Sequence, residues 1–403
     1  MFRNFLAVRF FIILALNMQS TIIYWWVYHL TNDVSLVGVL GLCEAIPAIG
    51  CSLFSGHFVD QREKKQMIAV CLVGYLLLSS MFTVLAWHVT ESVSIIMRLV
   101  YFGVFAGGVL RAFLSPASFA IMGMLLPRNE YANGTTWSST AWQIGAVVGP
   151  LLGGFILAFG VEIGMLTTAI LVLVSLVAIL RIPVQAIIQK EKEPILKSLR
   201  EGLRFVFKTQ VILAALSLDM FAVLFGGAVA LLPAYAKDIL HVGVIGFGWL
   251  RAAPGIGSVI TLGILSFLPL KTKPGYKLMI CIAGFGAVTI IFGISTSFIL
   301  SFAMLLIGGM FDAVSVVIRS TILQIYTPDA VRGRVAAVNT MFVSSSNELG
   351  AVESGYTAKW MGTVPAVIFG GCMTLVVVGV TYFAAPMLRV LNLSDDKKDK
   401  EEE

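Results

Sequence analysis

Apolar runs long enough to cross a membrane recur along almost the whole chain, from residue 5 to residue 388. A helix needs about 20 apolar residues to span the hydrocarbon core of a bilayer. Only short polar segments separate the runs, so the sequence predicts an all-α membrane protein. The twelve transmembrane helices are expected near residues 5–28, 34–57, 66–87, 93–125, 134–158, 162–183, 209–234, 243–268, 277–296, 298–325, 334–357 and 363–388.

The composition supports this class and excludes several others. Of the 403 residues, 58% are apolar and 12% are charged, whereas soluble domains carry about 25% charged residues. The five cysteines form no C-x-x-C pair and the four histidines do not cluster, so no disulfide, metal or cofactor is expected. The net charge of +6 suits contact with anionic lipid. Nucleic-acid binding is not expected, because the basic residues are concentrated in the loops.

The basic residues also predict the orientation. When alternate loops are assigned to opposite sides of the membrane, 22 of the 28 Lys and Arg residues fall on the side that carries both termini. The positive-inside rule makes that side cytoplasmic.

The longest polar stretch divides the chain almost in half. We expect an N-terminal six-helix half at 1–183, a cytoplasmic linker at 184–208, a C-terminal six-helix half at 209–388 and a disordered charged tail at 389–403. The linker has apolar and basic residues on opposite faces of a helical pattern after Pro194. This pattern favours an amphipathic helix on the membrane surface, although a solvated linker explains it equally well.

The two halves share a pattern of glycines and prolines. Segment 38–50 resembles segment 243–257, and at a shift of 201 residues further small residues coincide. Such a repeat predicts two pseudo-symmetric six-helix bundles, as in transporters built from parallel halves. The matched positions are Gly107 with Gly308, Gly108 with Gly309, Pro127 with Pro328 and Gly149 with Gly350.

Charged residues inside the spans require an explanation, because each costs roughly 2.5–3.5 kcal/mol at bilayer depth. The predicted spans 3, 6, 9 and 12 have none in their interiors, so these spans are the ones that can face lipid. The candidates for proton coupling or a substrate cavity are Asn17, Arg111, Asp219, Asp312 and Arg319. Candidate charges between the halves are Glu44, Arg251, Glu348 and Glu353.

The repeat places opposite charges at matched positions. Glu44 aligns with Arg251, Arg111 aligns with Asp312, and Asn17 aligns with Asp219. If the halves face each other around a two-fold axis, Arg111 and Asp312 approach across a central cavity. An acid that alternates between a proton and a basic partner couples proton flow to transport, but structural ion pairs and snorkelling side chains explain the same charges.

The loop after the second span carries a recognisable pattern. It has a glycine, an acid four residues later and then clustered bases, and this resembles the cytoplasmic loop signature of the major facilitator superfamily. The resemblance implies a latch on the inward gate, although Gln61 stands where a basic residue is usual. The residues of this pattern are Gly56, Asp60, Arg62, Lys64 and Lys65.

The fifth span carries a glycine-rich pattern that resembles the antiporter motif of the same superfamily. The glycines leave one helix face without side chains and the proline bends the helix, so another helix can pack closely; ordinary small-residue packing is the alternative. The motif residues are Gly145, Gly149, Pro150, Gly153 and Gly154. Segments 194–205 and 324–335 resemble the enterobactin-exporter-like branch, which includes macrolide-efflux relatives.

These resemblances imply a proton-coupled exporter of a small amphipathic molecule, such as a siderophore or a drug-like compound, in the bacterial cytoplasmic (inner) membrane. Small-molecule substrate, protons and membrane lipid are the expected partners, and a monomer is expected. An importer on the same fold and a non-transporting receptor or assembly partner remain alternatives. An enzyme is disfavoured because no nucleophile–base pair appears. Residues 24–28, at the outer end of the first span, favour an interfacial aromatic belt over a substrate site.

Overall fold

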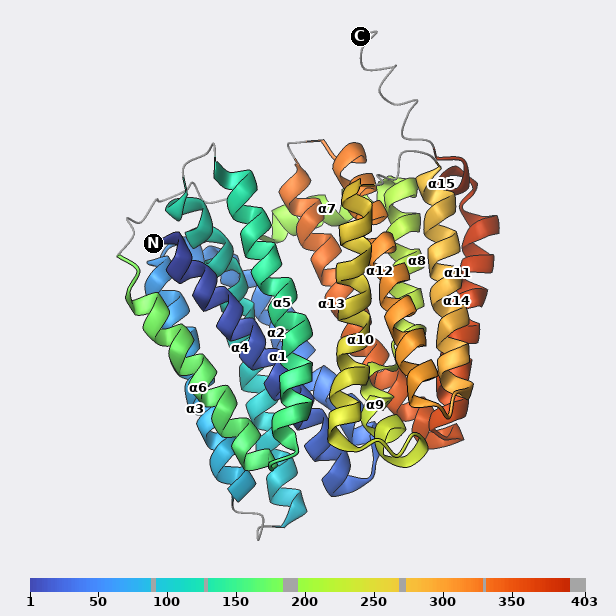
Figure 1. The fold of residues 1–403 in the computed structure, drawn as a ribbon. Coiled ribbons are helices and arrows are strands. Elements are labelled where there is room, and N and C mark those ends of the chain that lie inside the picture. The colour runs from blue at the N-terminus through green and yellow to red at the C-terminus, as the bar shows by residue number, and fades with distance from the viewer. Residues whose placement is uncertain (88–91, 127–129, 184–194, 268–272, 329–330, 392–403) are drawn as a thin grey trace. The chain divides into compact units, whose positions relative to one another are not determined.

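The computed structural model describes residues 1–87, 92–126, 130–183, 195–267, 273–328 and 331–391. These residues are almost entirely helical (Figure 1). The N-terminal half contains α1 (Phe2–Thr31), α2 (Val34–Asp60), α3 (Lys64–Trp87), α4 (Val93–Leu125), α5 (Tyr131–Leu157) and α6 (Val161–Leu180). After α7 (Ile195–Lys208) come α8 (Gln210–Gly226), η2 (Ala228–Leu231), α9 (Leu232–Ala234), η3 (Tyr235–Ile239), α10 (Gly243–Phe267), α11 (Pro274–Ile294), α12 (Phe298–Tyr326), α13 (Arg332–Met361), α14 (Thr363–Ala384) and α15 (Pro386–Val390).

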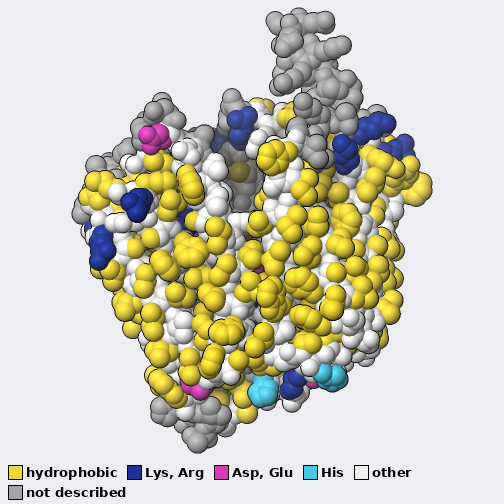
Figure 2. Space-filling model, in the orientation of Figure 1, with side chains coloured by type: hydrophobic (Ala, Val, Ile, Leu, Met, Phe, Trp, Pro, Cys, Tyr) yellow, Lys and Arg dark blue, Asp and Glu magenta, His cyan; other side chains and the backbone are white. Residues whose placement is uncertain are grey.

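Within the described residues, eleven helical segments are long and apolar enough to cross a membrane. The remaining predicted span corresponds to α13, which is 30 residues long but is rich in Ser, Asn and charged residues. On the face drawn in Figure 2, hydrophobic side chains cover the middle of the helices and charged side chains gather near their ends. This distribution is what a bilayer requires of a multi-pass protein.

The seventh span is not one continuous helix. It runs over Gln210–Ile239 as a membrane-length segment, but α8 ends at Gly226 and its C-cap Gly227 leaves helical geometry at ψ 74°. A short 3₁₀ turn (η2), one turn of α-helix (α9) and a π-helical turn (η3) complete the span. Such breaks leave backbone carbonyl groups that need partners.

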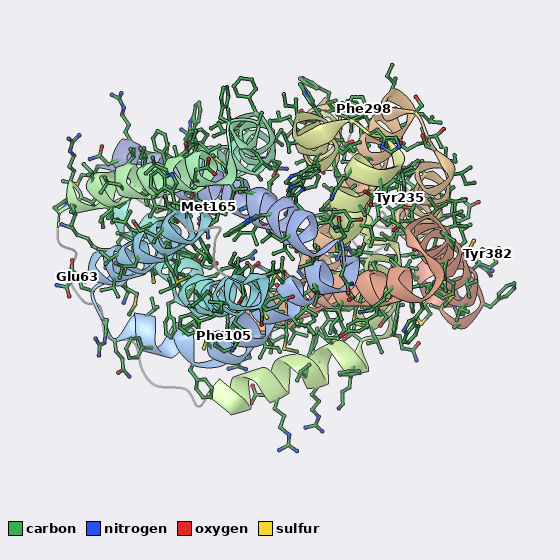
Figure 3. The ribbon with its side chains drawn as sticks, turned by 90° about the horizontal axis from the view of Figure 1, so that it is seen from below. Glu63, Phe105, Met165, Tyr235, Phe298 and Tyr382 are labelled. Atoms are coloured by element: carbon green, nitrogen blue, oxygen red, sulfur yellow. The ribbon has the colours of Figure 1, made fainter. Side chains whose placement is uncertain are left out.

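The chain divides into two compact units, and each unit has its own helix packing. Unit 1 comprises Met1–Lys192 and Leu232–Ala252. In it, α1 packs against α5 and α6, α2 against α4, and α3 against α4 and α6. The turn from α1 to α2 is fixed by Asp33, whose carboxylate accepts hydrogen bonds from the Ser35 backbone N–H and hydroxyl. Figure 3 shows Met165 of α6 among the helices, where it is fully buried.

Unit 2 comprises Glu193–Leu231 and Ala253–Glu403, and it repeats the packing scheme of unit 1. Its α8 packs against α13 and α14, and α11 packs against α12 and α14. A close contact also recurs, since Gly108 of α4 lies against the Glu44 carbonyl and Pro47 of α2, and Gly309 of α12 lies against the Pro254 carbonyl of α10. The repeated contacts support the internal repeat that the sequence indicates.

The first and seventh spans are equally long. The first span covers Phe2–Thr31 and the seventh covers Gln210–Ile239. The match of Asn17 with Asp219 across the two halves stays a prediction.

The predicted amphipathic helix of the linker corresponds to α7. It lies across the direction of the other helices of unit 2 in Figure 3, and its Glu201 forms a salt bridge with Arg334 of α13. Val206 is fully buried. Residues 184–194 and 392–403, which include the predicted linker start and most of the charged tail, lie outside the described residues. Placement of α7 on a membrane surface stays a prediction.

Candidate functional site

The most deeply buried ion pair in the described residues joins Asp219 of α8 to Arg319 of α12. The Arg319 Nη1 and Asp219 Oδ2 atoms are 2.8 Å apart, and the two side chains are only 6% and 5% exposed. Breaking a pair of this kind is costly because it leaves one charge without compensation. The Nε of Arg319 is buried and has no hydrogen-bond partner among the described residues, so the guanidinium retains a donor that a second acceptor can use.

A second carboxylate and a hydroxyl lie on the same face of α12. Asp312, Ser315 and Arg319 are spaced i, i+3 and i+7, which places them on one side of a helix. The Ser315 hydroxyl lies 3.4 Å from Asp219 Oδ1. Asp312 has no salt bridge among the described residues, yet it lines the same small cavity as Asp219, together with Cys281, Phe285 and Phe311.

This cluster of Asp219, Asp312, Ser315 and Arg319, called the acid–arginine cluster below, contains two carboxylates and one guanidinium. One Arg neutralises one of the two acids, so the other acid needs a proton, a cation or water. Three of these residues are candidates from the sequence. Ser315 was missed, although its position between two charged residues on one helix face is a usable signal.

In unit 1 the candidate Arg111 of α4 pairs with Glu44 of α2, and the pair bridges two packed helices. The Arg111 side chain is 58% exposed and that of Glu44 is 31% exposed. The sequence interpretation separated these residues, placing Glu44 with Arg251 and Arg111 with Asp312. Arg111 instead has a partner within its own unit, supplied by the helix pair that Gly108 and Pro47 bring together.

Arg251, which belongs to unit 1, has its partners in the C-terminal part of α1. Its Nη2 donates a hydrogen bond of 2.8 Å to the Ser20 hydroxyl, and its guanidinium lies 4.4 Å from the centre of the Tyr24 ring. Trp25 lies against Phe247. The interpretation of residues 24–28 as an interfacial aromatic belt is therefore wrong for most of them, because Trp25, Trp26 and Tyr28 are buried in protein contacts.

Two further polar contacts tie the same end of α1 to the segment Tyr235–Ile239. The Tyr28 hydroxyl donates a hydrogen bond to the Asp238 carboxylate. The Lys237 ammonium donates a 2.7 Å hydrogen bond to the Asn32 side-chain oxygen. The sequence did not indicate these pairs, because their members are separated by more than 200 residues and Lys237 and Asp238 lie beyond the predicted span 209–234.

The glycine pattern of α5 forms two contact surfaces. Gly145, Gly149 and Gly153 lie against backbone atoms of α1 between Phe10 and Met18. Gly154 faces another glycine, Gly248 of α10, and a Cβ atom on Gly154 would lie 2.6 Å from the Gly248 Cα. The expectation of tight helix packing at this motif is confirmed, and the glycine of the second helix is the part that the sequence did not identify.

The loop pattern after α2 is described only in part. The surroundings of Gly56 and of the Asp60 side chain are not among those that the structure describes. Lys64 is buried and donates hydrogen bonds to the carbonyl oxygens of Val59 at 2.7 Å and Arg62 at 3.0 Å. It thereby closes the C-terminal end of α2. Arg62 is exposed and stacks on Phe58, and Lys65 is half-buried.

The remaining candidates have separate surroundings. Asn17 donates a hydrogen bond of 2.9 Å to the Ile13 carbonyl and lies beside Gly149 of α5. Glu348 is half-buried on α13. Glu353, one turn further along, accepts a 2.9 Å hydrogen bond from the Thr357 hydroxyl.

Comparisons with family models and with known proteins agree on one family. A family model described as Major Facilitator Superfamily matches residues 5–351. The chain is 25% identical to the enterobactin exporter EntS of Shigella boydii serotype 4 (strain Sb227) over 391 residues, which cover 94% of this chain and 90% of the relative. It is 24% identical to the enterobactin exporter EntS of Citrobacter koseri over the same shares.

Solved structures share the fold at low identity. A mutant of the nucleoside transporter NupG aligns with a TM-score of 0.78 at 12% identity, covering 94% of this chain and 98% of the other. The D-xylose–proton symporter aligns with a TM-score of 0.72 at 13% identity over 97% and 99% of the two chains. A bacterial homolog of the human lysosomal transporter Spinster gives 0.71 at 15% identity over 96% of both chains.

Proposed function

We propose that this chain, which belongs to the major facilitator superfamily, is a proton-coupled antiporter that exports a small amphipathic molecule by alternating access. The chain is a multi-pass secondary transporter and not an enzyme. The proposal adds the direction, the coupling ion and the substrate class, which we take to be a siderophore or a drug-like compound. It also places the protein in the bacterial inner membrane with both termini in the cytoplasm.

The acid–arginine cluster is the observation that carries the proton coupling. Asp219 forms a 2.8 Å salt bridge with Arg319. Asp312 lines the same cavity as Asp219 and has no salt bridge in the described part of the chain. A carboxyl group held away from water without a counter-ion takes up a proton. When substrate or a conformational change draws Arg319 from Asp219 to Asp312, the proton on Asp312 is released, and Asp219, now without its counter-ion, takes up a proton. Exchange of one guanidinium between two acids therefore links proton movement to the state of the transporter.

The direction and the substrate class rest on other observations. The glycine pattern of α5 resembles that of antiporters, and relatives named enterobactin exporters cover 94% of this chain. Trp137 and Trp142 of α5 are 56% and 44% exposed, so their rings remain available to stack on an aromatic ligand. Import of a similar solute by the same fold is the second candidate, since the acid–arginine cluster serves either direction.

Transport by Asp312→Asn protein tests the proposal. The variant is reconstituted in vesicles of known orientation, with a catecholate siderophore and a cationic dye as probes and a pH gradient imposed. We expect wild-type protein to move a probe and protons in opposite directions, and Asp312→Asn to lose the dependence on the gradient while remaining folded. Glu162→Gln, which removes a carboxylate from the first turn of α6, is the matched control. Unchanged pH-dependent transport by Asp312→Asn would remove the cluster from the mechanism.

A further inference from the structure

We propose that unit 2 contains a binding site for an anionic phospholipid, in the groove between α8, α14 and α15. The groove has a volume of about 530 Å³, which is within the range of ligand-binding pockets. All of its lining residues belong to unit 2, and none of them belongs to the acid–arginine cluster. The inference therefore does not depend on proton-coupled export.

Small side chains create the groove, and a turn of the chain closes one end of it. Ala214 and Ser217 of α8 and Ala384 of α14 lie in the lining, where larger side chains would fill the seam between the helices. After α14, the C-cap Ala385 leaves helical geometry at ψ 65°, and α15 packs against α8 and α11. In Figure 1, α15 lies at the end of unit 2 where α8 begins. Leu388 of α15 is fully buried, which holds α15 over the groove.

The length of the groove matches one leaflet of a bilayer. Along α8 the lining runs from Gln210 to Phe221, which is about 16 Å at 1.5 Å per residue. Along α14 it runs from Val376 to Ala384, or about 12 Å. Half of the hydrocarbon core is about 15 Å thick. The groove therefore has the depth that an acyl chain of one leaflet occupies.

The groove is apolar and opens away from the core of the unit. Its wall on α14 comes from a helix without charged residues, and Val376 and Val380 on the lining face are exposed. The Thr381 hydroxyl, one of the few polar groups of the lining, donates a 2.8 Å hydrogen bond to the Val377 carbonyl of its own helix. This lining suits hydrocarbon rather than a polar solute.

Two basic side chains flank the end of the groove at which α8 begins. Arg389 directly follows the lining residue Leu388, and its guanidinium lies 4.8 Å from the centre of the Tyr382 ring, which helps to hold it in place. Lys208, the last residue of α7, is exposed and stands two positions before the lining residue Gln210. Neither base forms a salt bridge among the described residues. A phosphate-bearing headgroup supplies the complementary negative charge, so the groove and its rim together fit an anionic phospholipid.

Lipid binding to the purified full-length protein tests the site without any transported substrate. The protein is delipidated in a non-ionic detergent and titrated with dioleoyl phosphatidylglycerol or with dioleoyl phosphatidylcholine, which has the same chains and no net charge. Native mass spectrometry counts the bound lipids and gives each dissociation constant. We expect one saturable phosphatidylglycerol molecule per chain, bound at least about tenfold more tightly than phosphatidylcholine, because two basic residues face its headgroup.

Two variants separate the headgroup contact from the acyl-chain contact. Arg389→Gln should weaken phosphatidylglycerol binding by about fivefold and leave phosphatidylcholine binding unchanged. Ser217→Leu should weaken the binding of both lipids by at least about tenfold, because its side chain takes the place of part of the acyl chain. If Ser217→Leu does not fold, Ala384→Leu provides the same measurement from the facing helix.

Matched controls exclude general effects of charge and size. Lys359→Gln removes an exposed base at the far end of α13, and Gly379→Leu adds the same side chain to α14 in open space outside the lining; both should bind lipid as the wild type does. Equal affinity for the two lipids would overturn the proposal, because a neutral lipid would then fit as well. Wild-type phosphatidylglycerol affinity in both Arg389→Gln and Ser217→Leu would also contradict it. Neither result bears on proton coupling, which is tested by transport with Asp312→Asn.

Discussion

Replacing Asp219 by Asn should destabilise the protein strongly, because it leaves Arg319 charged and buried. The two side chains are 5% and 6% exposed, and their charged atoms are 2.8 Å apart. Removing one partner of a buried pair costs about 3–5 kcal/mol. The Nε of Arg319 already lacks a hydrogen-bond partner in the described part of the chain. A neutral amide in place of the carboxylate cannot restore the negative charge that compensates the guanidinium.

The pair of Arg111 with Glu44 provides a matched comparison, because it has the same chemistry and a different exposure. The Arg111 side chain is 58% exposed, and exposed pairs contribute about 0–1 kcal/mol. Glu44→Gln should therefore cost under about 1 kcal/mol. The double variant Asp219→Asn with Arg319→Met should recover about 1–3 kcal/mol of the loss in the single variant, since no buried charge remains.

The assay is equilibrium unfolding in mixed micelles, with the fluorescence of the seven tryptophans as the signal. The free energy of unfolding is compared among wild type, the two single variants and the double variant. The reasoning is refuted if Asp219→Asn costs no more than Glu44→Gln, or if the double variant is no more stable than Asp219→Asn alone. Either result would mean that burial does not determine how much the Asp219–Arg319 pair contributes to the free energy of unfolding.

Two further predictions concern packing and capping. Gly248→Ala should lower stability by about 1–3 kcal/mol and slow transport, because its Cβ would lie 2.9 Å from the Gly154 Cα; Gly263→Ala, with open space around it, should leave the melting temperature and transport unchanged. Lys64→Met should lower stability by about 1–3 kcal/mol, because it frees the Val59 and Arg62 carbonyls that Lys64 caps. Lys65→Met is the neighbouring control, and equal melting temperatures for the two lysine variants would contradict the capping role.

The helices could be predicted from sequence because a bilayer imposes length and polarity together. Most predicted spans agree with the structure within a few residues, as for 34–57 with Val34–Asp60. The break at Gly227 could not be predicted, because glycine is common in membrane helices and this chain has 38 of them. Pro47 and Pro254 lie inside continuous helices, so even a proline does not reveal a break.

The ionisable candidates were identifiable from their depth in the spans, but their partners were not. Asp219 and Arg319 are 100 residues apart, and only packing of α8 with α12 brings them together. The repeat suggested pairs between halves, whereas the structure pairs Arg111 with Glu44 inside one unit. Symmetry in a sequence reports equivalent positions, and equivalent positions need not be neighbours.

Because Leu232–Ala252 belongs to unit 1, the chain cannot be divided simply between its two sequence halves. A polypeptide that stops at residue 183 lacks Asp238, Gly248 and Arg251, which are the partners of Tyr28, Gly154 and Ser20. Such a fragment retains six spans but has an incomplete surface along α1 and α5. Split expression of the two sequence halves therefore requires their association, since the first half completes its packing only with residues that the second half supplies.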